Sequence, residues 1–330
     1  MDKVARLSST ERQELFSEAA ARKGVTPAII EKDFWVTWVL SKLFANDELA
    51  RLLMFKGGTS LSKVFRLIER FSEDIDLILD WNVLTSEEPL EDRSRRKQET
   101  LNNTINEQAK TYIAQILHPL IASQIEPVCR CVLDVDDGFV LNIHYPAAFP
   151  DLYLRPEVRL EIGPLAAWFP SGTFEISSYA AAEFPQVFAQ SSCRVKAILA
   201  ERTFWEKATI LHHEANRPTD SVQPPRYSRH YFDLARMAMS WVRGSALSRL
   251  DLLADVIAFK QRFYPRGWAQ YDRAVAGTLK LVPPPHVLSV IRQDYQNMQQ
   301  MIFGHSLTFE EMMATLNDLE KEINALSNQS

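Results

Sequence analysis

Two aspartates inside an apolar run constrain the fold of this chain more than any other feature. Asp74 and Asp76 alternate with Ile75 and Leu77 in the stretch DIDLIL. A β-strand turns alternate side chains to one face, so both carboxylates leave the same face, about 7 Å apart. Burial strengthens the repulsion between two such charges, and a divalent cation between them removes it. The stretch therefore indicates a cation-binding strand or, as the alternative, an edge strand whose aspartates are solvated.

A glycine pair lies one helix upstream of this strand. The apolar run LLMFK at 52–56 ends at Gly57 and Gly58, which is typical of a short buried strand followed by a tight turn. The spacing of the next apolar residues predicts a helix over 59–70, with its buried face on Leu61, Val64, Phe65 and Ile68. The local order is strand, glycine turn, helix and strand.

This order brings together the groups that phosphate chemistry needs. Backbone N–H groups next to glycines can approach a phosphate closely, and the start of a helix favours negative charge. Thr59 and Ser60 follow the glycines and add hydroxyl groups. A phosphate-binding turn combined with cation-binding carboxylates is typical of phosphoryl or nucleotidyl transfer. A glycine pair or an Asp-x-Asp triplet alone more often marks a turn or solvated residues, but the combination in this order favours catalysis.

The remaining pattern predicts an α/β fold in two domains. Helices are expected over 9–23, behind a capping box of Ser8 and Glu11, then from Pro27 onward, and in a long helix that ends near residue 125. Further strands are predicted over 128–134, 139–145 and 153–162. We expect a core with a small mixed sheet over residues 1–170 and a mainly helical domain over 171–330.

Composition and charge limit the kinds of protein that this chain can be. It is 46% hydrophobic and 24% charged, and no run of about 18 apolar residues predicts a membrane span. The first residues lack the apolar centre of a signal peptide, so we expect a cytoplasmic protein. The net charge of −5 argues against indiscriminate binding of phosphate backbones. The three cysteines form no C-x-x-C pair and are expected to be small buried residues, and no zinc or P-loop motif is present.

Four blocks of the sequence resemble motifs of one protein family, and they occur in the same order as in that family. The string FKGGTSLSKVFRLIERFSEDIDL is similar to the signature of polymerase-β-type nucleotidyltransferases, and in its full length to AbiEii/AbiGii-type toxins of two-gene toxin–antitoxin systems. The upstream helix IIEKDFWVTWVLSKLF and the later segments at 201–215 and 226–237 resemble further motifs of that family. The resemblance covers about residues 25–240 and implies a polymerase-β-like core.

The resemblance also implies roles for individual residues. Asp74 and Asp76 would bind the metal, with Ser72 directly before them, and Lys207 and Asp233 would complete the catalytic set. The nucleotide phosphates would be held by Gly57, Gly58, Thr59, Ser60 and Lys63. A third metal ligand is expected on a later strand, for which Glu161 is the candidate, although it equally fits the polar outer face of an edge strand.

The candidate site residues after position 200 also fit roles that are purely structural. Lys207 fits a surface lysine whose stem covers apolar neighbours, and Asp233 fits an ion pair with Arg229 or Arg236. The basic residues Arg226 and Arg229, with His230, fit either phosphate or RNA backbone binding or a solvated helix start.

The resemblance predicts a function as well. The chain would use Mg²⁺ or Mn²⁺ to move a nucleoside monophosphate from an NTP to an acceptor, plausibly the 3′ end of a tRNA. It would act as a toxin in growth inhibition and phage defence, with an antitoxin as protein partner and no membrane contact. The alternatives are transfer to a protein or a small molecule, and a non-catalytic module that binds nucleotide or RNA.

Overall fold

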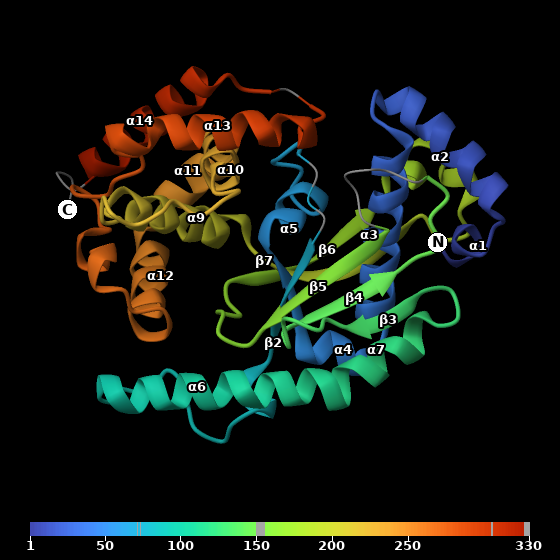
Figure 1. Cartoon of the computed structure of the whole chain (residues 1–330), viewed down its shortest axis with the longest axis horizontal. Helices are drawn as coiled ribbons and strands as arrows, with labels where there is room; N and C mark the ends of the chain where they lie inside the picture. Colours follow the sequence, from blue (N-terminus) through green and yellow to red (C-terminus); the bar gives the residue numbers. More distant parts are fainter. Residues whose placement is uncertain (71, 73, 150–155, 305, 327–330) are drawn as a thin grey trace. The chain divides into compact units, whose positions relative to one another are not determined.

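The computed structural model describes residues 1–70, 72, 74–149, 156–304 and 306–326, which divide into two compact units (Figure 1). The first unit combines Met1–Val64 with Phe71–Ile198. The second combines Phe65–Arg70 with Leu199–Ser330. The chain therefore enters the helical unit for six residues before it returns to complete the sheet.

One mixed sheet of seven strands forms the centre of the first unit. The strand order is β3-β4-β5-β2-β1-β7-β6, and the pairs β2/β5 and β1/β7 are parallel whereas the other neighbours are antiparallel. The strands are β1 (Leu53–Lys56), β2 (Asp74–Leu79), β3 (Arg130–Leu133), β4 (Val140–His144), β5 (Glu157–Gly163), β6 (Ser171–Ser177) and β7 (Ser192–Ile198).

The five predicted strands are confirmed, and two strands were missed. The start of the predicted strand at 153–162 lies partly outside the described residues, and β5 begins at Glu157. Strands β6 and β7 pair with each other, and β7 also pairs with β1. Because this pairing places 171–198 in the sheet of the first unit, the predicted domain boundary at residue 170 is wrong, and the boundary lies at residue 198.

The helices of the first unit include one that is buried on nearly all sides. Its central helix α3 begins with Pro27 at the predicted first position, and α2 carries the predicted capping box of Ser8 and Glu11. The α-helices of the first unit, within the described residues, are α1 (Asp2–Ala5), α2 (Ser9–Lys23), α3 (Pro27–Ala45), α4 (Asp47–Leu52), α5 (Gly57–Lys63), α6 (Arg95–Tyr112), α7 (His118–Ile125) and α8 (Tyr179–Glu183). A π-helical turn joins α6 to α7, which accounts for the long predicted helix.

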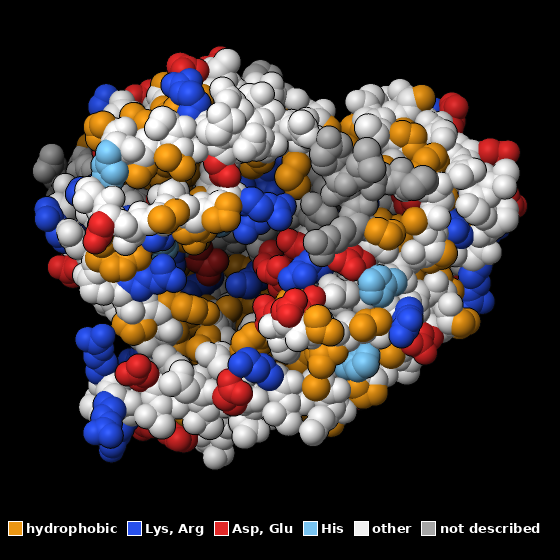
Figure 2. Space-filling view, viewed as in Figure 1, with side chains coloured by type: hydrophobic (Ala, Val, Ile, Leu, Met, Phe, Trp, Pro, Cys, Tyr) orange, Lys and Arg blue, Asp and Glu red, His pale blue; other side chains and the backbone are white. Residues whose placement is uncertain are grey.

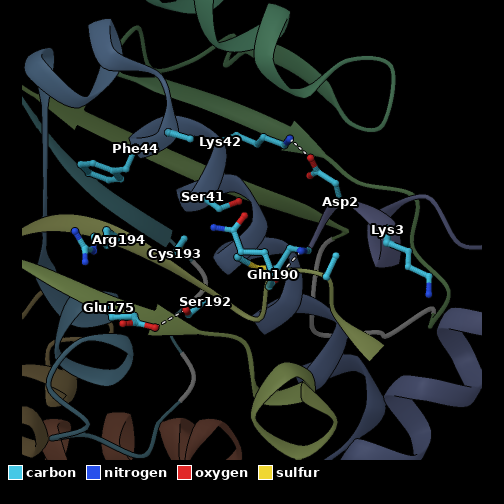
Figure 3. Close-up of a pocket in the computed structure, with 13 residues that line it drawn as sticks. Asp2, Lys3, Ser41, Lys42, Phe44, Glu175, Gln190, Ser192, Cys193 and Arg194 are labelled. Carbon is cyan, nitrogen blue, oxygen red and sulfur yellow. Dashed lines mark hydrogen bonds and ion pairs between the residues drawn. The ribbon is translucent and has the colours of Figure 1, made fainter. Parts of the chain in front are cut away.

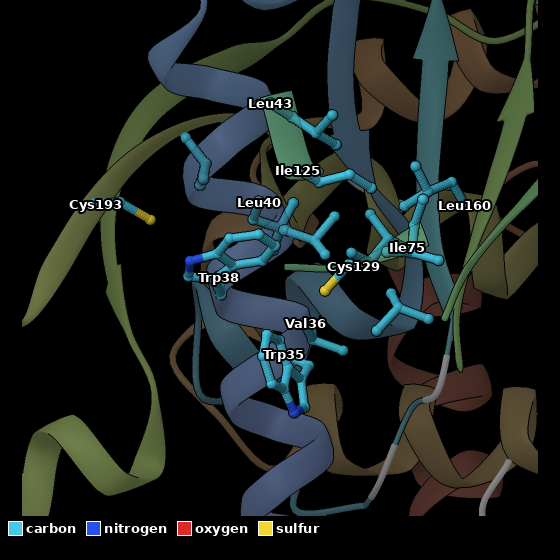
Figure 4. Close-up of a cluster of buried hydrophobic side chains, with 14 of the residues drawn as sticks. Trp35, Val36, Trp38, Leu40, Leu43, Ile75, Ile125, Cys129, Leu160 and Cys193 are labelled. Atoms are coloured by element: carbon cyan, nitrogen blue, oxygen red, sulfur yellow. The ribbon is translucent and has the colours of Figure 1, made fainter. Parts of the chain in front are cut away.

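The main core lies between α3 and one face of the sheet. Trp35 and Leu40 of α3 and Ile75 and Leu160 of the sheet are each fully buried in it (Figure 4). All three cysteines are buried without a disulfide, and burial raises the pKa of each thiol to about 12. The thiols therefore act as small apolar side chains, as the sequence predicted.

Strand β2 separates apolar and acidic side chains between the two faces of the sheet. Ile75 and Leu77 belong to the core against α3, together with Leu79. Asp74 and Asp76 alternate with them and therefore lie on the opposite face. Ile78, also on this opposite face, joins a small second cluster with Met54 and Ile198. The sheet thus presents both aspartates on the face that α3 does not cover.

The helix after the glycine pair is shorter than the sequence pattern predicted. Helix α5 ends at Lys63, and Arg66 adopts a φ of 55°, in the left-handed region that interrupts a right-handed helix. The predicted helix over 59–70 is therefore wrong beyond its first half. Residues 65–70 instead run into the second unit, where Arg70 forms an isolated β-bridge with Ile302.

The described part of the second unit is mainly helical, as predicted. Its central helix α9 packs against α10, α11 and α12. The helices are α9 (Ala200–Ala215), α10 (Ser228–Ala238), α11 (Val242–Leu247), α12 (Leu250–Phe263), α13 (Leu288–Met298) and α14 (Phe309–Ala325). No helix in the described parts of either unit is long and apolar enough to cross a membrane.

Candidate active site

The glycine turn and the acidic strand meet at Gly57 and Asp76. Gly57 has a φ of 80°, and a Cβ placed on it would lie 1.9 Å from Oδ2 of Asp76. Only glycine allows this approach, because any Cβ would overlap the carboxylate. In the sheet, Asp76 lies opposite Lys56 of β1 and Glu161 of β5. The contact between the two motifs that the sequence order suggested is therefore present.

An arginine neutralises part of the acidic face. Nε of Arg159 lies 3.8 Å from Oδ1 of Asp74, Nη1 lies 3.4 Å from Oδ2 of Asp134, and Nη2 lies 3.8 Å from Oε1 of Glu161. The space-filling view shows acidic side chains gathered around basic ones over this part of the sheet (Figure 2). The sequence pattern did not single out Asp134, which lies where the β3–β4 hairpin turn begins.

The donor set on this face fits a divalent metal with two protein carboxylates. Asp74 and Asp76 supply the hard oxygen ligands that Mg²⁺ and Mn²⁺ prefer, and Mg²⁺ sites in nucleotide enzymes commonly use one or two carboxylates with substrate phosphates. Among the described residues, no three His, Cys, Asp or Glu side chains converge closely enough to hold a metal. Glu161 lies beside Asp76 in register, but the described part of the chain does not bring it into a three-ligand cluster.

The hydroxyls after the glycine pair contact the backbone. Thr59 is buried and donates through Oγ1 to the carbonyl oxygen of Asp74. Ser60 is also buried and donates through Oγ to the carbonyl oxygen of Gly57, at 2.9 Å. Both hydroxyl protons therefore go to backbone oxygens: Ser60 bonds within the first turn of α5, and Thr59 fixes α5 to the start of β2.

Lys63 forms a buried ion pair within the first unit. Its Nζ lies 2.5 Å from Oδ1 of Asp33 and 2.9 Å from the carbonyl oxygen of Ser177. Oδ2 of Asp33 accepts a hydrogen bond from the backbone N–H of Tyr179. Burial raises the pKa of Asp33, against the effect of Lys63. These contacts join α5 to α3 and to the start of α8.

Ser72 is half-buried, and both of its sequence neighbours lie outside the described residues. Its predicted role therefore stays a prediction.

Lys207 and Asp233 form a buried cluster with a third residue in the second unit. Nζ of Lys207 lies 2.8 Å from Oδ2 of Asp233. Arg70 binds the same carboxylate with both ends of its guanidinium group, from Nε to Oδ1 at 2.7 Å and from Nη2 to Oδ2 at 2.8 Å. The predicted partners of Asp233, Arg229 and Arg236, are therefore wrong. The sequence pattern missed Arg70 because helical periodicity placed it at the end of the predicted helix over 59–70.

Burial and charge act in opposite directions on this cluster. Burial alone would raise the pKa of Asp233, but the charges of Arg70 and Lys207 hold it below its ordinary value. Burial also lowers the pKa of Lys207, against the effect of Asp233, and lowers the pKa of the nearby His230 well below its usual range. Asp233 is thus an ionised carboxylate whose two oxygens accept from cations. This arrangement fits a residue that orients Lys207 better than a general base.

A pocket of about 760 Å³ lies elsewhere in the first unit (Figure 3). It is lined by residues of α1, the end of α3, the segment before β7 and the strands β6 and β7, among them Asp2, Lys42, Gln190 and Arg194. None of the predicted site residues lines this pocket. It is therefore separate from the acidic face.

Comparison with known proteins gives the family of the chain. The family model of the nucleotidyl transferase AbiEii toxin of type IV toxin–antitoxin systems matches residues 38–315. The chain belongs to the AbiEii family. The suspected resemblance is thereby confirmed, and the AbiEii chain described here is a nucleotidyltransferase toxin with an NTP as substrate and an antitoxin as partner.

A solved structure is similar to this chain at low sequence identity. The nucleotidyltransferase toxin MenT4 from Mycobacterium tuberculosis is 15% identical to this AbiEii chain, with a TM-score of 0.46. The match covers 97% of this chain and 99% of MenT4. No curated protein matches the chain at the level required for significance.

Proposed function

We propose that this AbiEii-family protein transfers a nucleoside monophosphate from an NTP to the 3′ end of an RNA, with tRNA as the acceptor class. The acceptor hydroxyl attacks the α-phosphorus, the bond to the β-phosphate breaks, and pyrophosphate leaves. The contact between Asp76 and Gly57 carries the proposal, because it joins the acidic strand to the glycine turn.

Asp74 and Asp76 would hold Mg²⁺ or Mn²⁺, which supplies charge neutralisation for the nucleotide phosphates when bound. The backbone N–H groups at Gly57 and Gly58 would bind phosphate oxygens. Thr59 and Ser60 would support that turn through their hydrogen bonds to the backbone. Lys207, oriented by Asp233, would bind a phosphate as a point charge. Ser72 and Glu161 remain candidate residues of the same site.

A basic segment supports an RNA acceptor. Arg95, Arg96 and Lys97 form the first turn of α6, all three are exposed, and none has an ion-pair partner among the described residues. Basic side chains gather at this end of α6 (Figure 2). Cations at a helix start are opposed by the helix dipole, so local stability does not explain them. Phosphate groups of an RNA backbone are partners of the right charge.

The toxin role would be growth inhibition during phage defence, held in check by the antitoxin. Expression of the wild type from a tightly controlled promoter in a bacterial host should stop growth, and Asp76→Asn should relieve the arrest. Normal growth with an enzyme that is active on RNA would remove the growth-inhibition part of the proposal.

Transfer is tested by incubating the purified chain with each labelled NTP, total RNA and Mg²⁺. We expect label on RNA with the wild type and none with Asp76→Asn. Glu157→Gln is a matched control for Asp76→Asn. It removes a carboxylate at the start of β5, away from Glu161, which lies beside Asp76 in register. Label on protein alone would favour a protein acceptor, and nucleotide binding without transfer would favour a non-catalytic module.

A further inference from the structure

One segment of the second unit interleaves basic and aromatic residues. Residues 260–280 contain five Lys or Arg residues, four aromatic residues and a single acidic residue, Asp272, in a chain whose net charge is −5. The segment begins in the last turn of α12 and continues through two 3₁₀ turns, Gly267–Ala269 and Tyr271–Arg273. This local excess of positive charge calls for either an ion-pair network or an anionic partner.

Ion pairs within the chain do not account for three of these cations. Arg266, Arg273 and Lys280 are exposed, and none of them forms an ion pair with another described residue. By contrast, the exposed Arg249 and Arg292 each pair with a carboxylate of the same unit, at 2.8 and 2.5 Å. The three cations of the segment therefore stand out from other surface arginines of this unit.

The three cations gather around the end of α9. The backbone N–H of Lys280 donates to Nδ1 of His212 at 3.0 Å. Burial is the main cause that lowers the pKa of His212, and the charges of Lys280 and Arg273 lower it as well. Burial also lowers the pKa of His213, in the same direction as the charge of Arg266. A helix end favours nearby cations by about 0.3–1 kcal/mol each, which does not neutralise their charges.

An aromatic ring holds one of these guanidinium groups in place. Cζ of Arg266 lies 5.7 Å from the centre of the Trp268 ring, and Cζ of Arg217 lies 4.9 Å from it. The ring of Trp268 packs edge-on against the buried His213, with 5.5 Å between the ring centres. Arg217 is paired with both oxygens of Glu214. Arg266 is thus positioned by Trp268 while its exposed side chain can reach an anion.

We propose that Arg266, Arg273 and Lys280 form a surface that binds the phosphate backbone of a single-stranded part of the RNA acceptor. This inference rests on the proposed function, in which the acceptor is an RNA. Phosphodiester groups match the charge of the three cations, and a guanidinium group binds phosphate through directional hydrogen bonds. Basic residues interleaved with aromatic ones are typical of proteins that bind single strands.

An anionic membrane surface fits these residues less well. Membrane-surface segments present their aromatic side chains for insertion between lipids. Trp268 is instead half-buried, with Arg217 and Arg266 over its ring. The aromatic ring therefore supports cations, as expected for a surface that binds a charged backbone.

Binding is measured by fluorescence anisotropy, with the purified full chain and a labelled oligouridine RNA of about 20 nucleotides at several salt concentrations. The triple variant Arg266→Gln/Arg273→Gln/Lys280→Gln should weaken binding about tenfold or more at low salt. The slope of log K against log salt should fall by up to about two, since each contact with a single strand contributes about 0.7. Trp268→Leu keeps every charge and should weaken binding about threefold with the slope unchanged.

The matched control is Arg249→Gln/Arg292→Gln/Lys321→Gln, which removes the same amount of charge from exposed positions of the same unit. It should bind the RNA within about twofold of the wild type. Equal weakening in the two triple variants would show that binding follows net charge. That result, unchanged binding in the first triple variant, or no binding by the wild type would overturn the inference. Every cation in the two triple variants is exposed, so both should fold.

Vesicles that contain phosphatidylserine are the second probe. We expect weaker binding to them than to the RNA, with no difference between the wild type and the first triple variant. Stronger binding to vesicles that this variant loses would assign the surface to a membrane and would also overturn the inference.

Failure of the proposed function is separable from failure of this inference. If the variants bind the RNA as expected, but no NTP is transferred to any acceptor, then only the proposed function is wrong. If transfer to RNA is observed and the first triple variant binds the RNA as well as the wild type, then only the role of this surface is wrong.

Discussion

Oδ2 of Asp76 occupies the space in which a side chain of residue 57 would have to begin. The distance from that oxygen to a Cβ built on Gly57 is 1.9 Å, and the backbone there has a φ of 80°. The absence of a side chain at Gly57 thus leaves room for the carboxylate of Asp76, and the positions of the two residues depend on each other.

Gly57→Ala should therefore reduce transfer activity about 100-fold, because a displacement of about 1 Å in a reacting group has effects of this size. The φ value should add about 1–2 kcal/mol of destabilisation. Activity assays and thermal melts of the variant measure both effects. Gly163→Ala is the control, since no atom lies within 4 Å of its Cβ position. Equal activity of the two variants would show that the turn is unimportant.

Asp76→Asn and Glu161→Gln should differ in their effects. Loss of Asp76 removes one of two candidate metal ligands and should lower kcat about 1000-fold, corresponding to about 4 kcal/mol. Glu161 contacts Arg159 and belongs to no three-ligand cluster within the described residues, so Glu161→Gln should lower kcat less than about tenfold. Steady-state kinetics with saturating NTP and Mg²⁺ make the comparison. A loss in Glu161→Gln as large as that in Asp76→Asn would establish a third ligand.

Lys63→Met should act on stability. The variant leaves Asp33 buried without its cation, which typically costs about 3–5 kcal/mol. The double variant Lys63→Met/Asp33→Asn should recover part of this loss, because an asparagine can still accept from Tyr179 N–H. Urea denaturation measures the difference. An unchanged free energy of unfolding with a raised KM for NTP would instead support the predicted phosphate role.

The basic turn of α6 should affect RNA more than nucleotide. Replacing Arg95, Arg96 and Lys97 with glutamine should weaken RNA binding and reduce its dependence on salt by up to about three counterions. The KM for NTP should not change. Lys110→Gln, on the same helix and paired with Glu107 at 2.7 Å, is the control. An unchanged salt dependence in the triple variant would place the acceptor elsewhere.

His212 should make the protein less stable in weak acid. Its Nδ1 accepts from the backbone N–H of Lys280 at 3.0 Å, and its Nε2 lies 3.1 Å from the carbonyl oxygen of Gln270, so the buried ring is neutral. Burial lowers the pKa of His212 to about 4 from an unfolded value of 6.5. The folded state thus binds fewer protons, and its stabilisation is complete above pH 6.5 and is lost as the pH falls towards 4.

The loss reaches about 3 kcal/mol at most. Free energies of unfolding measured between pH 7 and pH 4 should fall more steeply in the wild type than in His212→Gln. The exposed His286→Gln should follow the wild type. Parallel curves for all three proteins would contradict the assignment of a neutral buried ring.

The local chemistry of β2 was predictable because it follows from side-chain alternation. Asp74 and Asp76 share a face whatever the rest of the fold does, and Gly57 lies one short helix away along the chain. Strand β7 also carries an alternating signal at Cys193, Val195 and Ala197, which short length and polar neighbours obscured. Signals of this kind depend only on the nearest residues.

Long-range pairing explains what was not predictable. Arg70 reaches Asp233 across 163 residues of sequence, and no local pattern contains that separation. Lys63 similarly pairs with Asp33, 30 residues away, although its position beside the glycine turn suggested a phosphate ligand. The buried ion pairs follow from tertiary packing, which overrides what each side chain would do on an isolated helix.

Because residues 65–70 belong to the helical unit, the chain cannot be divided into two complete units by a single cut. A cut after residue 198 would leave Asp233 with one of its two cations and the N–H of Phe303 without its acceptor on Glu69. A two-piece version would need this hexapeptide on the helical piece, for example by circular permutation. During synthesis, residues 65–70 emerge well before residues 199–330, so this strip has to wait for the rest of its unit before it can take its final contacts.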